Sequence, residues 1–153
     1  MKASLLLAGL LIAAPALHAE QIKRTPIPNS NFPISVAVSV PANADTVYFS
    51  GVLPESIEGD TQTQTQSVLT RLKTALANEG LTFADVVSLR VFLVGDPKLD
   101  NKLDFKGLNA SFGQFFGTAE QPNKPARTAL QVAALPLPGA LVEIDLIAAR
   151  VKK

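Results

Sequence analysis

The amino-acid sequence predicts a single α+β domain in which a mixed β-sheet carries two helices on one face. The chain of 153 residues is long enough for one hydrophobic core and too short for two, and 47% of its residues are hydrophobic. Strand-like and helix-like patterns alternate along it in the order ββαβαββ. Helices that connect strands in this way commonly pack on the same face of the sheet.

The first half of the chain predicts a hairpin and a helix after an irregular start. Residues 20–33 contain three prolines, which is typical of a leader that crosses the surface. Branched apolar residues predict strands at 34–40 and 46–51, joined by a turn. Apolar residues then recur three or four apart over 61–79, and Gly80 follows where a left-handed residue commonly ends a helix.

The second half adds a strand, a helix and a final pair of strands. Apolar and branched residues predict a strand at 86–94, and a helix is expected over 103–116. The phenylalanines of this helix are expected to pack in the core rather than to stack on a cofactor. Two apolar runs at 125–136 and 141–148 are separated by Pro138 and Gly139, so they predict a hairpin.

One face of this C-terminal hairpin would be polar. Successive strand residues point to opposite sides of a sheet, so Glu143 and Asp145 share a face. Arg127 and Gln131 share a face of the preceding strand, and antiparallel pairing would place them beside the two acids. The sequence therefore predicts the candidate site on this face.

The N-terminus has the pattern of a secretory signal peptide over residues 1–19. Lys2 gives a basic start, Leu5–Ala16 is a mostly apolar run, and Ala19 is a small residue at the expected cleavage site. The run is shorter than the roughly 20 residues of a membrane-spanning helix. We expect cleavage after Ala19, a periplasmic or secreted location, and no membrane attachment afterwards, with a retained signal anchor as the alternative. The folded domain is expected over 34–153.

The composition of the mature chain limits its chemistry. Without residues 1–19 the chain keeps 13 Lys and Arg against 13 Asp and Glu, which disfavours binding to nucleic acid. The sequence contains no cysteine, and its only histidine, His18, lies in the predicted signal peptide. No thiol nucleophile, imidazole base or His/Cys metal site is therefore expected, and catalysis would depend on other side chains and on the backbone.

Several motifs in register resemble those of the RidA (reactive intermediate deaminase) family. They are Ser50-Gly51 with Pro54, Asn109-Ala110, Pro125–Thr128, Val132–Pro136 and Val142–Ala148. The resemblance spans residues 34–151 and implies a chorismate-mutase-like fold, assembled as a homotrimer with ligand clefts between subunits. It also implies hydrolysis, without cofactor or metal, of enamines and imines such as 2-aminoacrylate and 2-iminobutanoate to a 2-oxo acid and ammonia.

By this resemblance, Arg127 is the residue that holds the substrate carboxylate. The assignment is chemically reasonable, because a guanidinium forms two parallel hydrogen bonds to a carboxylate and a strand holds it rigidly. An ordinary salt bridge from Arg127 to Glu143 or Asp145 is the alternative.

The other implied substrate-binding residues are Ser50, Gly51, Asn109 and Ala129. Ser50 and Gly51 match the loop that lines the family's site, where a glycine permits close backbone approach to a ligand; a plain turn is the alternative. Asn109 matches an asparagine near the cleft, and a helix-surface or capping role is as well supported. A backbone group of Ala129 would help to hold the substrate nitrogen.

Four positions depart from the family pattern. The water-orienting glutamate of the family is Asp145 here, whose carboxylate falls back by about 1.5 Å, one carbon–carbon bond. The cysteine after the arginine is Ala129, the loop glutamine is Val52, and the N-terminal tyrosine is Ile34. Glu143 lies on the same strand face as Asp145 and is a candidate to replace it, although an interface or solvent role is as well supported.

Two functions remain open from the sequence. In the first, Arg127 fixes an imino-acid carboxylate and Asp145 positions the attacking water. In the second, a non-enzymatic module of the same fold binds small carboxylates or protects proteins, because the altered residues leave no competent water. The predicted export gives weight to the second, since reactive enamines arise mainly from cytoplasmic enzymes. We expect the deaminase.

Overall fold

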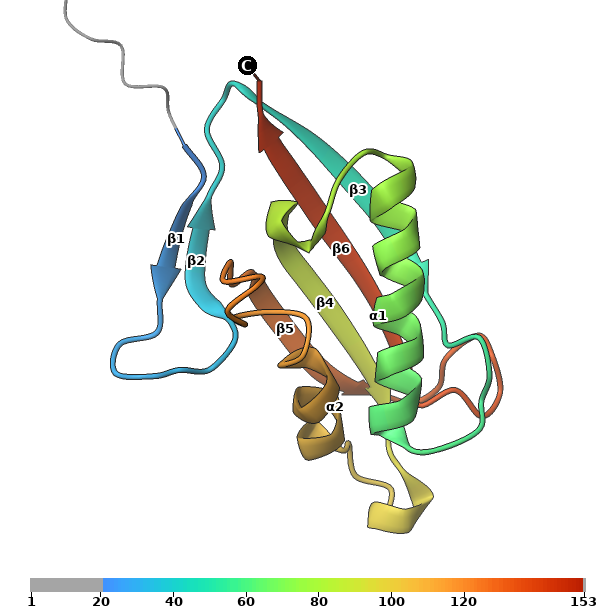
Figure 1. The fold of residues 1–153 in the computed structure, drawn as a ribbon. Coiled ribbons are helices and arrows are strands. Elements are labelled where there is room, and N and C mark those ends of the chain that lie inside the picture. The colour runs from blue at the N-terminus through green and yellow to red at the C-terminus, as the bar shows by residue number, and fades with distance from the viewer. Residues whose placement is uncertain (1–20, 153) are drawn as a thin grey trace, which may run out of the picture.

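The computed structural model describes residues 21–152, and the predicted signal peptide lies outside the described residues. The described chain has the expected α+β architecture, a mixed four-stranded sheet with two helices on one face (Figure 1). A separate two-stranded ribbon lies beside one edge of that sheet. Within residues 21–152, no helix combines the length and apolar character needed to cross a membrane.

The chain forms six strands and two α-helices in the described range. Their bounds are β1 Lys23–Pro26, β2 Ser35–Ser39, β3 Ala44–Val52, α1 Thr61–Asn78, β4 Val86–Val94, α2 Phe105–Phe112, β5 Ala126–Val132 and β6 Val142–Val151. Short 3₁₀ turns at Phe83–Asp85 and Pro97–Leu99 precede β4 and α2. The expected order ββαβαββ is found from β2 onward, and β1 is an additional strand within the segment expected to be an irregular leader.

The expected C-terminal hairpin is wrong. The sheet order is β3-β6-β4-β5, in which β5 pairs parallel to β4 and β6 pairs antiparallel to both β3 and β4. The chain passes through α2 between β4 and β5, and such a crossover returns it parallel to the strand it left. Residues 133–141 then carry the chain past β4 to the central position. Strand alternation predicted correctly which residues of one strand share a face, but not which strands are neighbours.

The expected hairpin of the first two strands is also wrong, because β2 pairs with β1 rather than with β3. β6 offers β3 a better partner: four of its residues (Val142, Ile144, Leu146 and Ala148) are buried apolar side chains. By contrast, Val36 of β2 is 62% exposed. Pairing of β3 with β6 completes the core, so β2 is left to form the ribbon with β1.

The core lies between the helices and the sheet, as the apolar patterns predict. Asp60 caps α1 by accepting a hydrogen bond from the Thr63 amide at 2.8 Å, and the buried residues of the helix face the sheet. The second helix is shorter than expected and ends at Phe112, and irregular turns follow. Phe112 and Phe116 are essentially inaccessible to solvent, with ring centres 4.6 Å apart, which confirms the predicted core role of these phenylalanines.

Candidate functional site

The predicted site residues lie on two faces of the sheet. Arg127 of β5 lies beside Leu89 of β4, whereas Asp145 of β6 lies beside Arg90. Leu89 is buried under the helices, and the side chain of Arg90 is 67% exposed on the open face. Because consecutive strand residues point to opposite faces, Arg127 lies on the helix side and Asp145 on the open side. The expectation that Arg127 lies beside the acids of β6 is therefore wrong.

Aromatic rings surround the guanidinium of Arg127. Its central carbon lies 4.3 Å from the ring centre of Phe112, 5.6 Å from that of Phe105 and 5.4 Å from that of Phe32. Phe105 and Phe112 come from α2, and Phe32 comes from the loop between β1 and β2. These distances fall within the range of cation–π attraction, so the rings hold the charge in a mostly apolar setting.

Arg127 has an unused hydrogen-bond donor in this setting. Its Nη1 atom is buried and has no partner among the described residues, and none of the ion pairs in that range involves Arg127. Burial lowers the pKa of the guanidinium to about 10, which leaves it charged at neutral pH. The ordinary salt bridge to Glu143 or Asp145 is thus not formed. A buried cation without an anionic partner is costly, and it is suited to receive an anion.

Asn109 positions Arg127. Its Oδ1 atom accepts a hydrogen bond from Arg127 Nη2 at 2.8 Å, while its Nδ2 atom donates to the Phe105 carbonyl one helical turn earlier at 2.7 Å. The second bond fixes the amide orientation, so Oδ1 faces the arginine. Asn109 therefore contacts Arg127 directly and also bonds back to its own helix.

Three of the remaining predicted residues, Ser50, Gly51 and Asp145, lie along a cleft of about 570 Å³ on the open face. Its lining includes Tyr48, Ser50, Gly51, Ser88, Arg90 and Asp145. Gly51 lies where the β3–β6 register shifts, and a Cβ atom added there would overlap the Glu143 carboxylate, only 2.9 Å from its Cδ. A side chain at this position would have to displace the end of the Glu143 side chain, so Gly51 lies at a close approach in an irregular strand pair rather than in a simple turn.

Asp145 is held by Arg90. Arg90 Nε donates to Asp145 Oδ1 at 3.0 Å and Nη2 lies 2.7 Å from Oδ2, which is a two-point ion pair. The hydrogen bond to Asp145 raises the pKa of Arg90. Both carboxylate oxygens of Asp145 are thus engaged, although lone pairs on each remain able to accept a bond from water.

Gln131 and Ala129 continue the helix-side row from Arg127. Gln131 accepts from the Leu103 amide at 2.9 Å and donates to the Asn101 carbonyl at 3.0 Å, so it fixes the turn before α2 and does not contact the acids of β6. Ala129 packs against the core. Residues 21–152 contain no group of three or more His, Cys, Asp or Glu side chains placed to hold a metal ion.

Two residues that contact the predicted site residues directly, Arg90 and Phe32, were not among those predicted. Arg90 is the only charged residue of β4, and its place on a strand otherwise rich in apolar residues was a usable signal. Phe32 lies in the segment expected to be a leader, and nothing in the local pattern indicates that it reaches α2. Its contact with Arg127 depends on the position of the β1–β2 ribbon beside β5.

Comparisons with known proteins agree with this architecture. The chain is 36% identical to Protein DfrA of Myxococcus xanthus over 143 residues, covering 90% of this chain and 96% of that protein. It is 36% identical over 109 residues to the 2-iminobutanoate/2-iminopropanoate deaminase of Capra hircus, covering 67% and 72%. A crystal structure from Yersinia pestis, YyfB of the conserved Rid protein family, matches with a TM-score of 0.64 and 32% identity over 78% of this chain and 89% of that one.

The family model described as Endoribonuclease L-PSP matches residues 20–150, which include the strands and helices that carry Arg127, Asn109 and Asp145. The match also includes β1 and the loop with Phe32, so the ribbon lies within the region that the family model covers. On this match over most of its length, the chain belongs to the Endoribonuclease L-PSP family.

Proposed function

We propose that this protein hydrolyses small 2-imino acids and their enamine tautomers, of the 2-iminobutanoate and 2-aminoacrylate type, to 2-oxo acids and ammonia. The observation that carries the proposal is the buried guanidinium of Arg127, which keeps an unused donor and has no carboxylate partner in the described chain. A small carboxylate is the anion that this planar donor matches best. The name of the goat relative supports an imine as the reacting group.

The proposed reaction adds water across the carbon–nitrogen double bond of the protonated imine. The resulting carbinolamine releases ammonia, and the oxygen from water becomes the carbonyl oxygen of the 2-oxo acid. The hydrolysis transfers no electrons and its atoms balance with water alone, so it requires neither a redox cofactor nor a metal. These imines also hydrolyse without an enzyme, so orientation of substrate and water can supply much of the acceleration.

Each predicted residue has a proposed role in this reaction. Arg127, positioned by Asn109, would hold the substrate carboxylate. Asp145 is the group to which the family resemblance assigns the attacking water, and Glu143 is the neighbouring carboxylate on the same face. Backbone groups near Gly51 and Ala129 would hold the nitrogen. The positions of Ser50, Gly51 and Asp145 along one cleft support a common role for these three.

We also propose a homotrimer, because the two groups of site residues lie on opposite faces of one sheet. A single chain cannot present Arg127 and Asp145 to the same small molecule. A neighbouring copy can do so if its open-face cleft covers the Arg127 side of the first. Light scattering of the mature protein at micromolar concentration tests this, and a monomeric mass would contradict it.

The second candidate is a non-enzymatic module that binds small carboxylates. The ion pair between Arg90 and Asp145 favours it, because a carboxylate engaged at both oxygens has fewer lone pairs available to orient a water molecule. Under this alternative Arg127 still binds the carboxylate, but no turnover follows.

The deciding experiment measures ammonia released from 2-iminobutanoate generated in situ, with the uncatalysed rate subtracted. The mature protein should accelerate release, and Arg127→Ala should abolish the acceleration. Arg150→Lys is the matched control, because Arg150 lies at the far end of β6 and pairs with Asp85. If the parent gives no acceleration yet binds 2-oxobutanoate through Arg127, the binding module is correct and the deaminase is not.

Export with cleavage after Ala19 is a further part of the proposal, supported by the basic start and short apolar run of residues 1–19. The intact mass of the natively expressed protein measures the cleavage directly. A mass that includes Met1 or Lys2, in protein recovered from the cytosol, would contradict it.

A further inference from the structure

The guanidinium of Arg127 has no open route to solvent at the donor that a carboxylate needs. Its Nη1 atom is buried, and three phenylalanine rings lie around the group. If Arg127 binds a carboxylate, one of the covering side chains has to move. The ring that moves should be the one whose displacement costs the least free energy.

The ring of Phe112 belongs to the hydrophobic core, whereas the rings of Phe32 and Phe105 do not. Phe112 has no solvent exposure and stacks on Phe116 within the core. Phe105 is the first residue of α2 and is 45% exposed. Phe32 lies in the loop between β1 and β2, and its ring stacks on Phe105 with centres 6.3 Å apart and an interplanar angle of 27°. Phe32 is half-buried, and neither ring of this pair belongs to the core cluster, so the pair is the part of the cover that can be displaced at the lower cost.

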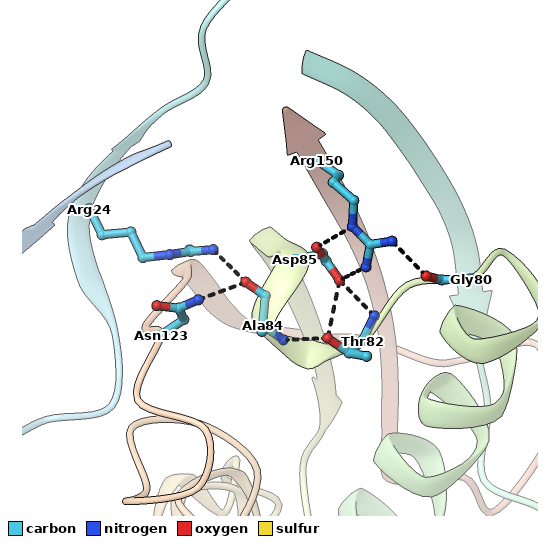
Figure 2. A network of polar contacts seen from close by, with 7 residues as sticks. All are labelled: Arg24, Gly80, Thr82, Ala84, Asp85, Asn123 and Arg150. Carbon is cyan, nitrogen blue, oxygen red and sulfur yellow. Dashed lines mark hydrogen bonds and ion pairs between the residues drawn. The ribbon is translucent and has the colours of Figure 1, made fainter. Parts of the chain in front are cut away.

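Hydrogen bonds anchor both strands of the ribbon, on either side of the loop that carries Phe32. Arg24 of β1 donates from Nη2 to the Ala84 carbonyl at 3.0 Å (Figure 2), and from Nη1 to the carbonyls of Val86 at 2.9 Å and Lys124 at 3.3 Å. At the start of β2, the Ser35 hydroxyl donates to the Lys124 carbonyl at 2.6 Å. The Phe32 amide, in contrast, bonds only locally to the Ser30 hydroxyl at 3.1 Å.

We propose that Phe32, together with Phe105, forms an aromatic gate that determines which carboxylates reach Arg127. The inference rests on the proposed role of Arg127 as the carboxylate anchor. Displacing the Phe32–Phe105 pair exposes the donor while the ribbon stays attached through Arg24. Phe32 acts on specificity without touching the reacting carbon.

The gate also indicates the class of substrate. A ligand held by Arg127 would place its side chain against the displaced rings. An apolar side chain keeps those rings out of water, whereas a second carboxylate would lose its hydration against ring faces, which carry negative charge density. The site should therefore select small 2-imino monocarboxylates with an apolar side chain over dicarboxylates.

The test is the binding kinetics of 2-oxobutanoate, a stable product of the proposed reaction, and of 2-oxoglutarate. Phe32→Ala should raise the association rate constant for 2-oxobutanoate by about two- to tenfold, the factor by which one aromatic pair shifts an equilibrium. It should also reduce the preference for 2-oxobutanoate over 2-oxoglutarate. Phe32→Leu, which keeps bulk but not the ring face, should lie between the two proteins. Val36→Ala, in the same ribbon and exposed, is the control and should bind like the parent.

The outcomes separate the gate from the proposed function. If the parent binds 2-oxobutanoate in an Arg127-dependent way and both Phe32 variants bind with the same rates and the same preference, the gate is wrong and the anchor stands. If neither the parent nor Phe32→Ala binds, the anchor and the gate both fail. If only Phe32→Ala binds, the gate is supported. Thermal unfolding of each variant confirms that the fold is retained, because Phe32 is outside the main core cluster.

Discussion

Replacing Arg127 with methionine should stabilise the fold while abolishing carboxylate binding. Burial lowers the pKa of Arg127 to about 10, and each unit of this lowering corresponds to about 1.4 kcal/mol, so burial of the charge costs on the order of 3 kcal/mol. The side chain is partly exposed, and solvent screening reduces this to about 2 kcal/mol. Loss of the Asn109 hydrogen bond and of the cation–π contacts offsets about 1 kcal/mol.

The net expectation is that Arg127→Met raises the free energy of unfolding by about 1 kcal/mol, which is about 3 °C in melting temperature for a chain of this size. Methionine is apolar and flexible, so it can fill the space between the rings. Urea unfolding at pH 7 gives the stability, and calorimetric titration with 2-oxobutanoate gives the affinity. A gain of stability together with a loss of binding would show that Arg127 serves ligand binding and lowers the stability of the folded protein.

The control for this experiment is Arg150→Met. Arg150 pairs with Asp85 through two hydrogen bonds at 2.9 and 2.6 Å and donates to the Gly80 carbonyl at 2.8 Å (Figure 2), so its removal should lower stability. If Arg127→Met is destabilised as much as Arg150→Met, the rings and Asn109 satisfy the guanidinium fully. The inference of an anion-seeking arginine would then be refuted.

Four other substitutions test the remaining assignments. Arg127→Lys should weaken binding of 2-oxobutanoate by about 2 kcal/mol in calorimetry, because an ammonium cannot make the planar two-point contact; unchanged affinity would contradict the anchor. Asp145→Glu should raise turnover with affinity unchanged, and Asp145→Asn should abolish turnover with binding preserved, so a parent-like rate in both would remove Asp145 from the reaction. Asp60→Ala should cost about 1 kcal/mol in urea unfolding at pH 7. The backbone hydrogen bond from Thr63 lowers the pKa of Asp60, so this stabilisation is present above its unfolded pKa and is lost as pH falls through the folded value. A cost that persists at pH 2 would contradict the carboxylate as its source.

Local patterns predicted the elements well because helices and strands bury one face with a fixed period. The α1 helix, the strand β4 and the core phenylalanines of α2 were all recognisable from spacing. The order of the strands was not recognisable, because alternation indicates which residues share a face of the sheet but not which strands are hydrogen-bonded to each other. The surroundings of the site residues were unpredictable for the same reason. Asn109 was predicted through the family motif, whereas the contacts of Phe32 with Arg127 and of Arg90 with Asp145 depend on which strands lie side by side.

The central position of β6 has a consequence for how the chain folds. β6 is the last strand of the sequence, yet it supplies the hydrogen-bonding partner for β3 on one side and for β4 on the other. Until residues 142–151 have been made, β3 has no partner strand and the sheet lacks the strand that lies between β3 and β4. Pairings between such distant segments form slowly, so the sheet stays open until β6 has been made. Such delayed closure suits a chain proposed to cross a membrane before it folds, and it makes Val142–Val151 indispensable to a sheet whose first strand begins at Ala44.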